Sequence, residues 1–101
     1  MSSLLKVAAK LANPPYAVTF TAHGNSMKPL IRDGQIVTVT TVEHPENLKQ
    51  GDVVLARAGQ RFYLHKVTAV DHKRQRVQIG NNRGHVNGWV GYGNVHGICR
   101  V

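Results

Sequence analysis

The chain has 101 residues, 42% of them hydrophobic, which predicts one globular domain and excludes a disordered tail. A single cysteine, Cys99, excludes an internal disulfide, and no apolar run reaches the roughly 20 residues of a membrane-spanning helix. The net charge of +8 leaves nucleic acid open as a less favoured partner, because the basic residues are spread along the chain and only residues 72–76 are densely basic.

The N-terminal stretch predicts a short helix over residues 4–12, with an apolar face opposite Lys6 and Lys10. Asn13-Pro14-Pro15 ends this helix, since proline cannot continue it. We expect the helix to cover one end of the domain, or alternatively to form a weak surface anchor through its lysines. The two lysines also interrupt any signal-peptide core, so we expect a cytoplasmic protein.

The rest of the chain predicts strands and turns. Stretches rich in β-branched and aromatic residues, or alternating in polarity, predict strands over 16–22, 35–42, 52–58, 61–70, 76–79 and 95–101. The stretches 80–84 and 91–94 are predicted loops, and 72–76 is an exposed hairpin turn. These elements predict a mostly β, compact antiparallel domain, with residues 1–15 as helix and Pro linker and 16–101 as the β-domain. Cys99 lies in the apolar run VHGICRV, which indicates a buried, unreactive thiol.

Residues 24–30, GNSMKPL, place Ser26 in a turn directly after the first predicted strand. Gly24 and Asn25 favour this turn, whose backbone N–H groups can point at a developing oxyanion. A serine hydroxyl becomes a nucleophile only when a base lies within hydrogen-bonding reach. Without such a base, Ser26 is an ordinary turn serine.

The candidate bases are two neighbours on one strand. Of the six histidines, only His65 lies within a strongly predicted strand, RFYLHKVTAV, and alternation puts His65 and Lys66 on opposite faces. Only one of the two can face Ser26. A lysine base must lose about three pKa units to be neutral near pH 7, whereas a histidine is already mostly neutral there. This favours His65, with Lys66 as the alternative base; a half-exposed strand histidine without a function stays open.

The order of several motifs resembles that of the superfamily of signal peptidases and LexA-type self-cleaving repressors. The matching stretches are GNSMKPLIRDGQIVTV (24–39), GDVV (51–54), HKV (65–67), IGNNR (79–83) and VHGIC (95–99). The resemblance implies a LexA/signal-peptidase-like β-domain without the transmembrane anchor of the signal peptidases. It also implies that Ser26 is the nucleophile and that His65 takes the base position of the histidine-type enzymes.

The chain departs from the family pattern at positions that are usually acidic. Gln35 and Asn81 stand where aspartates are usual, and Asn87 lies near where the histidine-type enzymes often place another. Asn81 or Asn87 can orient an imidazole by hydrogen bonding but cannot stabilise an imidazolium by charge. A catalytically silent relative that acts as a binding or assembly module therefore stays open beside an active enzyme.

The resemblance implies a polypeptide substrate bound as an extended strand beside the segment that enters Ser26, with Phe20, Ala22 and Met27 as its contacts. We expect a serine endopeptidase that cuts one specific bond of a partner protein through a Ser26–His65 dyad, in a phage or prokaryotic setting. The backbone of residues 24–26 would hold the oxyanion, and no cofactor or metal is expected. His65→Ala should abolish cleavage and Lys66→Ala should spare it.

Overall fold

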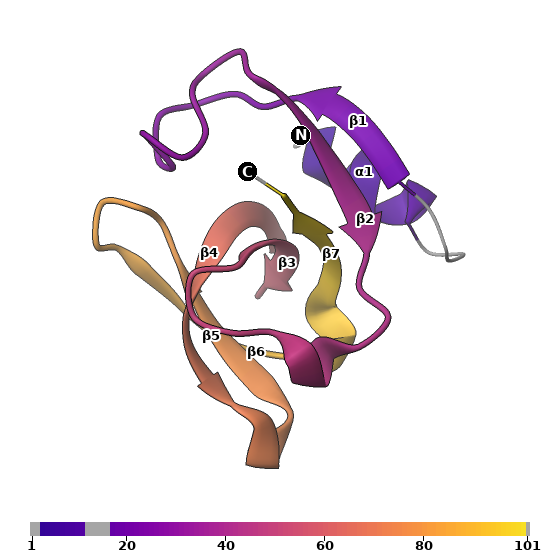
Figure 1. The fold of residues 1–101 in the computed structure, drawn as a ribbon, viewed down its shortest axis with the longest axis vertical. Coiled ribbons are helices and arrows are strands. Elements are labelled where there is room, and N and C mark those ends of the chain that lie inside the picture. Colours follow the sequence, from indigo (N-terminus) through magenta and orange to yellow (C-terminus); the bar gives the residue numbers. More distant parts are fainter. Residues whose placement is uncertain (1–2, 12–16, 101) are drawn as a thin grey trace.

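The computed structural model describes residues 3–11 and 17–100. In these ranges the chain forms one helix, seven strands and three 3-10 turns (Figure 1). The helix is α1 (Ser3–Lys10), and the 3-10 turns are η1 (Pro45–Asn47), η2 (His72–Arg74) and η3 (Tyr92–Asn94). The strands are β1 (Ala17–Thr21), β2 (Ile36–Thr41), β3 (Val53–Ala58), β4 (Arg61–Asp71), β5 (Arg76–Gly80), β6 (Val86–Gly91) and β7 (Val95–Cys99). The predicted mostly β fold with one short helix is confirmed.

All seven strands belong to one antiparallel sheet in the order β1-β2-β7-β3-β4-β5-β6. β3 lies in the middle, and β1 and β6 are the edges. The sheet coils strongly, so that in Figure 1 the β1–β2 end and the β5–β6 end curve around opposite sides of β3 and β7. Sheets of this length curl because each strand is twisted relative to its neighbour.

The central strand separates two hydrophobic cores. Val53 and Leu55 face a core that also contains the apolar side of α1, whereas Val54 and Ala56 face a second core under β5 and β6. This alternation follows from the two-residue period of a strand, and burial on both faces explains the unbroken apolar run of β3. The helix therefore packs on the β-domain as predicted, and Cys99 is buried beside it, as expected for an unreactive thiol.

Strand β6 was not predicted, because its sequence VNGWVG contains an asparagine and two glycines, which usually indicate a loop. Hydrogen bonds to β5 stabilise it instead, and Gly88, at φ +130°, lies next to a shift in the pairing register. Tertiary pairing has overridden local propensity here. The other predicted strands all form. The predicted helix end at Ala12, the Pro linker, Tyr16 and Val101 lie outside the described residues.

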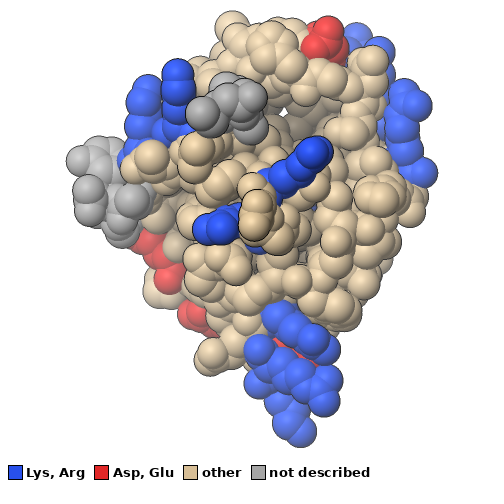
Figure 2. Space-filling model, turned by 180° about the vertical axis from the view of Figure 1, so that it is seen from behind, with Lys and Arg blue, Asp and Glu red and all other residues tan. Residues whose placement is uncertain are grey.

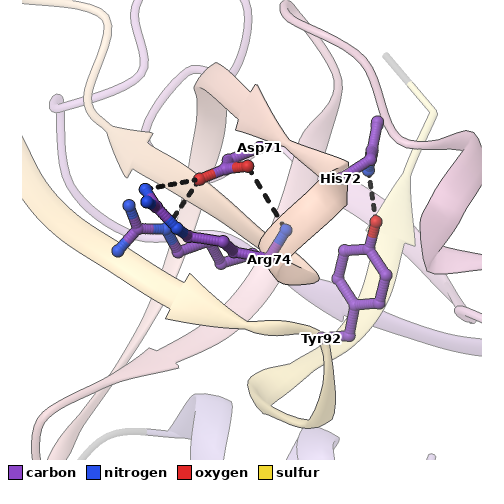
Figure 3. Close-up of polar contacts among 5 residues, drawn as sticks. Asp71, His72, Arg74 and Tyr92 are labelled. Carbon is purple, nitrogen blue, oxygen red and sulfur yellow. Dashed lines mark hydrogen bonds and ion pairs between the residues drawn. The ribbon is translucent and has the colours of Figure 1, made fainter.

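The basic stretch after β4 forms the predicted hairpin turn, but its charges are partly neutralised. Asp71 pairs with Arg74 and Arg76, and the backbone N–H of Arg74 also donates to the Asp71 carboxylate (Figure 3). His72 is not an exposed turn residue: its ring contacts the Tyr92 hydroxyl and lies 2.8 Å from the Leu48 carbonyl oxygen. On the face drawn in Figure 2, Lys and Arg side chains form several separate groups, the densest at the tip of this hairpin.

Candidate active site

Ser26 lies in a tightly bonded turn between β1 and β2. Gly24 adopts φ +100°, which favours glycine, and its N–H donates to Oδ1 of Asp33 over 2.8 Å. Met27 is buried in the core next to α1, so it anchors the turn rather than contacting a substrate. The Ile31 N–H donates to the Met27 carbonyl oxygen and closes one helical turn behind the serine. These bonds hold Ser26 at the surface on a fixed backbone.

His65 reaches this serine from β4. Its Nε2 lies 3.3 Å from Ser26 Oγ, although 39 residues separate the two in the chain. The residue is 8% exposed, so it is not the half-exposed strand histidine that was considered from the sequence. The separation is that of a loose hydrogen bond, typical of a nucleophile and base before substrate binds.

The second ring nitrogen of His65 is held by an asparagine from β6. Asn87 Oδ1 lies 2.6 Å from His65 Nδ1. An amide oxygen is an acceptor only, so it places the proton on Nδ1 and leaves the Nε2 lone pair directed at Ser26. Asn81 does not play this part: its side chain accepts from the N–H groups of Arg83 and His85 and closes the β5–β6 loop.

Burial is the main influence on the acidity of this histidine. Desolvation lowers the pKa of His65 from its usual 6.5, the Asn87 hydrogen bond partly opposes that shift, and the electrostatic interaction with His85 lowers the pKa further. The imidazole is therefore predominantly neutral at pH 7, which is the form that accepts a proton.

Lys66 lies on the opposite face of β4, as strand alternation predicts. Its Nζ donates to Asn82 Oδ1 over 2.9 Å. Among the residues that the structure describes, no hydrogen bond joins Lys66 to Ser26. The geometry thus brings His65, and not Lys66, to the serine hydroxyl.

An open cavity of about 430 Å³ begins at Ser26 and His65. Residues from the end of β1, the first half of β4 and the helix α1 line it. Its lining residues are Leu4, Phe20, Thr21, Ala22, His23, Ser26, Phe62, Tyr63, Leu64 and His65. Two of the three residues expected to contact a substrate, Phe20 and Ala22, line this cavity.

The backbone of residues 24–26 offers fewer oxyanion donors than the sequence suggested. The Gly24 N–H is already bound to Asp33, as described above. Within the described ranges, no acceptor is bonded to the N–H groups of Asn25 and Ser26. Of the three expected donors, these two are therefore available to a developing oxyanion.

The antiparallel β-domain with one short helix agrees with the LexA/signal-peptidase-type fold that the motif order implies. The family model described as Peptidase S24-like matches residues 2–86, and the chain belongs to this family. No curated protein matches the sequence at a significant level. In the parts of the chain that the structure describes, no helix is long and apolar enough to cross a membrane.

Two residues of this site were missed from the sequence. Asp33, which fixes Gly24, occurred only within the matching stretch 24–39, and Asn82 only within the matching stretch 79–83 and the predicted loop 80–84. The dipeptide Asp33-Gly34 is a turn signal, but nothing local indicates that its carboxylate reaches back nine residues. Both contacts depend on how loops fold over one another.

The lowered pKa of His65 gives a first prediction. The reactivity of Ser26 should rise as pH increases through this pKa, with its midpoint below 6.5, because the protonated ring cannot accept the serine proton. Asn87→Asp should move the midpoint to higher pH, since a carboxylate favours the imidazolium. NMR titration of the His65 ring would measure both midpoints, with His23→Ala as control; an unmoved midpoint in Asn87→Asp would contradict the contact.

Proposed function

We propose that this protein is a serine endopeptidase that cuts a polypeptide through Ser26 and His65. The observation that carries the proposal is the alignment of Ser26 Oγ, His65 Nε2, His65 Nδ1 and Asn87 Oδ1 at 3.3 and 2.6 Å. Such a chain supplies the nucleophile, its base and the group that fixes the tautomer of the base.

The reaction would proceed in two balanced halves. Ser26 Oγ attacks the carbonyl carbon of the scissile bond while its proton passes to His65 Nε2, and the carbonyl oxygen accepts from the Ser26 N–H. The imidazolium then gives that proton to the departing amine nitrogen, which leaves an ester on Ser26. Water, deprotonated by the same nitrogen, attacks the ester, and the proton returns to Ser26 as the acid product leaves.

Asn87 sets the expected speed of this enzyme. It holds the tautomer that catalysis needs, but it brings no negative charge to stabilise the imidazolium. We therefore expect a slower enzyme than one with a carboxylate at this position. The missing charge is also what favours the second candidate function, a silent relative that binds a polypeptide in the same groove without cutting it.

The substrate would bind as an added strand. β1 is an edge strand, so the backbone groups on its outer side are open to an extended peptide, and β1 leads directly into the turn of Ser26. The cavity beside it is lined by Phe20, Ala22, Phe62 and Leu64, which favours an apolar side chain next to the cut bond. Arg74 and Arg76 are paired with Asp71, which neutralises part of the positive charge of the basic tip.

The direct test is a library of short peptides incubated with the wild-type protein and with Ser26→Ala, read by mass spectrometry. Cleavage by wild type alone, with an apolar residue at a fixed position before the cut, is the expected result. Peptides bound by both proteins and cut by neither would replace the peptidase with the silent relative.

The helix α1 should influence which side chain fits. Leu4 lines the cavity, whereas its neighbour Leu5 is 43% exposed and does not line it. Leu4→Ala should widen the cavity, so that peptides with a larger apolar side chain gain relative to peptides with a small one by about 10-fold, the selectivity that one or two methylene groups can give.

Leu5→Ala is the matched control, since it removes the same atoms from the same helix. The measurement is the ratio of kcat/KM for two peptides that differ only in this side chain. The role of Leu4 would be refuted if both variants moved the ratio equally.

A further inference from the structure

Lys66 has no part in the proposed chemistry, yet it is half-buried and specifically bonded. It follows His65 on β4 and projects from the other face of the strand, where its Nζ lies 2.9 Å from Asn82 Oδ1. An ammonium donor strengthens a hydrogen bond to a neutral oxygen. This contact therefore fixes which end of the Asn82 amide faces Lys66.

Asn82 in turn is bonded to the nucleophile turn at two points. Its backbone N–H donates to the Ser26 carbonyl oxygen over 2.8 Å, and its Nδ2 donates to the Lys28 carbonyl oxygen over 2.7 Å. Arg83 adds a third contact, from Nε to the Asn25 carbonyl oxygen. Figure 1 shows the β5–β6 loop lying next to the loop between β1 and β2 that contains Ser26.

We propose that Lys66 is a positioning residue that fixes the nucleophile turn relative to the base through Asn82. Two adjacent residues of β4 then position Ser26. His65 contacts its hydroxyl, and Lys66 bonds Asn82, whose backbone N–H in turn bonds the Ser26 carbonyl oxygen. This inference rests on the proposed function, because it assigns the fixed Ser26–His65 geometry a role in catalysis.

The same contact argues against Lys66 as the base. A base needs a lone pair directed at the serine proton, whereas Lys66 Nζ is directed at Asn82 Oδ1 and, among the described residues, forms no hydrogen bond with Ser26. The role is instead one of geometry, where a displacement of about 1 Å of a reacting atom can lower a rate about 100-fold. Lys66→Met keeps the bulk of the side chain and removes only the donor.

The test is a double-mutant cycle on Lys66 and Asn82. We expect Lys66→Met and Asn82→Ala each to slow modification of Ser26 by a serine-directed electrophile about 10- to 100-fold, and the double variant to be no slower than Asn82→Ala. The acidic midpoint of the pH profile should not move, and Lys66→Arg should recover most of the rate. Lys73→Met, which removes an exposed lysine, is the control and should match wild type.

Amide hydrogen exchange gives a readout that does not need activity. In Lys66→Met the Asn82 amide should exchange faster than in wild type, because its bond to the Ser26 carbonyl is loosened. Unchanged exchange and unchanged rate, or additive effects in the cycle, would overturn the proposal. So would a pH midpoint that shifts in Lys66→Met, or a modification rate that fails to recover in Lys66→Arg. A wild-type protein that forms no adduct would refute the proposed function, while the exchange experiment would still decide the role of Lys66.

Discussion

Replacing His65 with alanine should lower the rate at which Ser26 reacts with a serine-directed electrophile by about 10³-fold or more. The variant loses the only side chain hydrogen-bonded to Ser26 Oγ among the described residues, and with it the acceptor for the serine proton. The hydroxyl then reacts at the rate of an ordinary turn serine. The second-order rate constant of modification, measured by intact mass, gives the effect.

His23→Ala is the matched control for this experiment. His23 lines the same cavity, but its Nδ1 faces Asp33 over 3.8 Å rather than Ser26, and it is exposed. We expect a rate constant within about 3-fold of wild type. A His65→Ala variant that retains the wild-type rate constant, or a His23→Ala variant that loses it, would remove His65 from the role of base.

Gly97→Ala should cause a large loss of stability. Gly97 lies on β7 between β2 and β3, opposite Thr41 and Leu55. A Cβ there would clash with Val39 Cγ1, lie 2.9 Å from Leu11 Cδ1 and meet the Thr40 carbonyl oxygen at 3.1 Å. Because these neighbours belong to the core and the backbone, we expect a loss of about 3 kcal/mol of unfolding free energy, at the upper end for overpacking.

Gly93→Ala is the control that tests whether the steric clash causes the loss of stability in Gly97→Ala. Gly93 lies in η3, where an added Cβ meets no atom within 4 Å. The same chemical change there should alter the unfolding free energy by less than about 0.5 kcal/mol. Urea denaturation of the three proteins measures the difference, and equal stability of Gly97→Ala and wild type would show that β7 and α1 do not pack as described.

The parts of the fold that depend on local pattern could be predicted from the sequence. The β-branched runs of β2, β3 and β4 indicate strands, and alternation alone puts His65 and Lys66 on opposite faces. β6 could not be predicted, because Asn87, Gly88 and Gly91 are poor strand formers whose place is fixed by β5.

Some residues of the candidate site could likewise be predicted from the sequence, and others could not. Local turn chemistry and motif order led to Ser26 and His65. They could not decide between Asn81 and Asn87, since that choice depends on how β6 lies against β4. Met27 was expected among the substrate contacts, but the turn directs it into the core. Contacts between loops far apart in the chain carry no local signal, which is why Asn82 was overlooked.

The central claim is that Ser26 is activated, and peptide mapping after treatment with a fluorophosphonate tests it most directly. The wild-type protein should gain one adduct, located on Ser26, and the adduct should form faster as pH rises from 5 to 8 in step with deprotonation of His65. Ser26→Ala should gain none under the same conditions. A folded wild-type protein that stays unmodified throughout this range, or an adduct on another residue, would contradict the account.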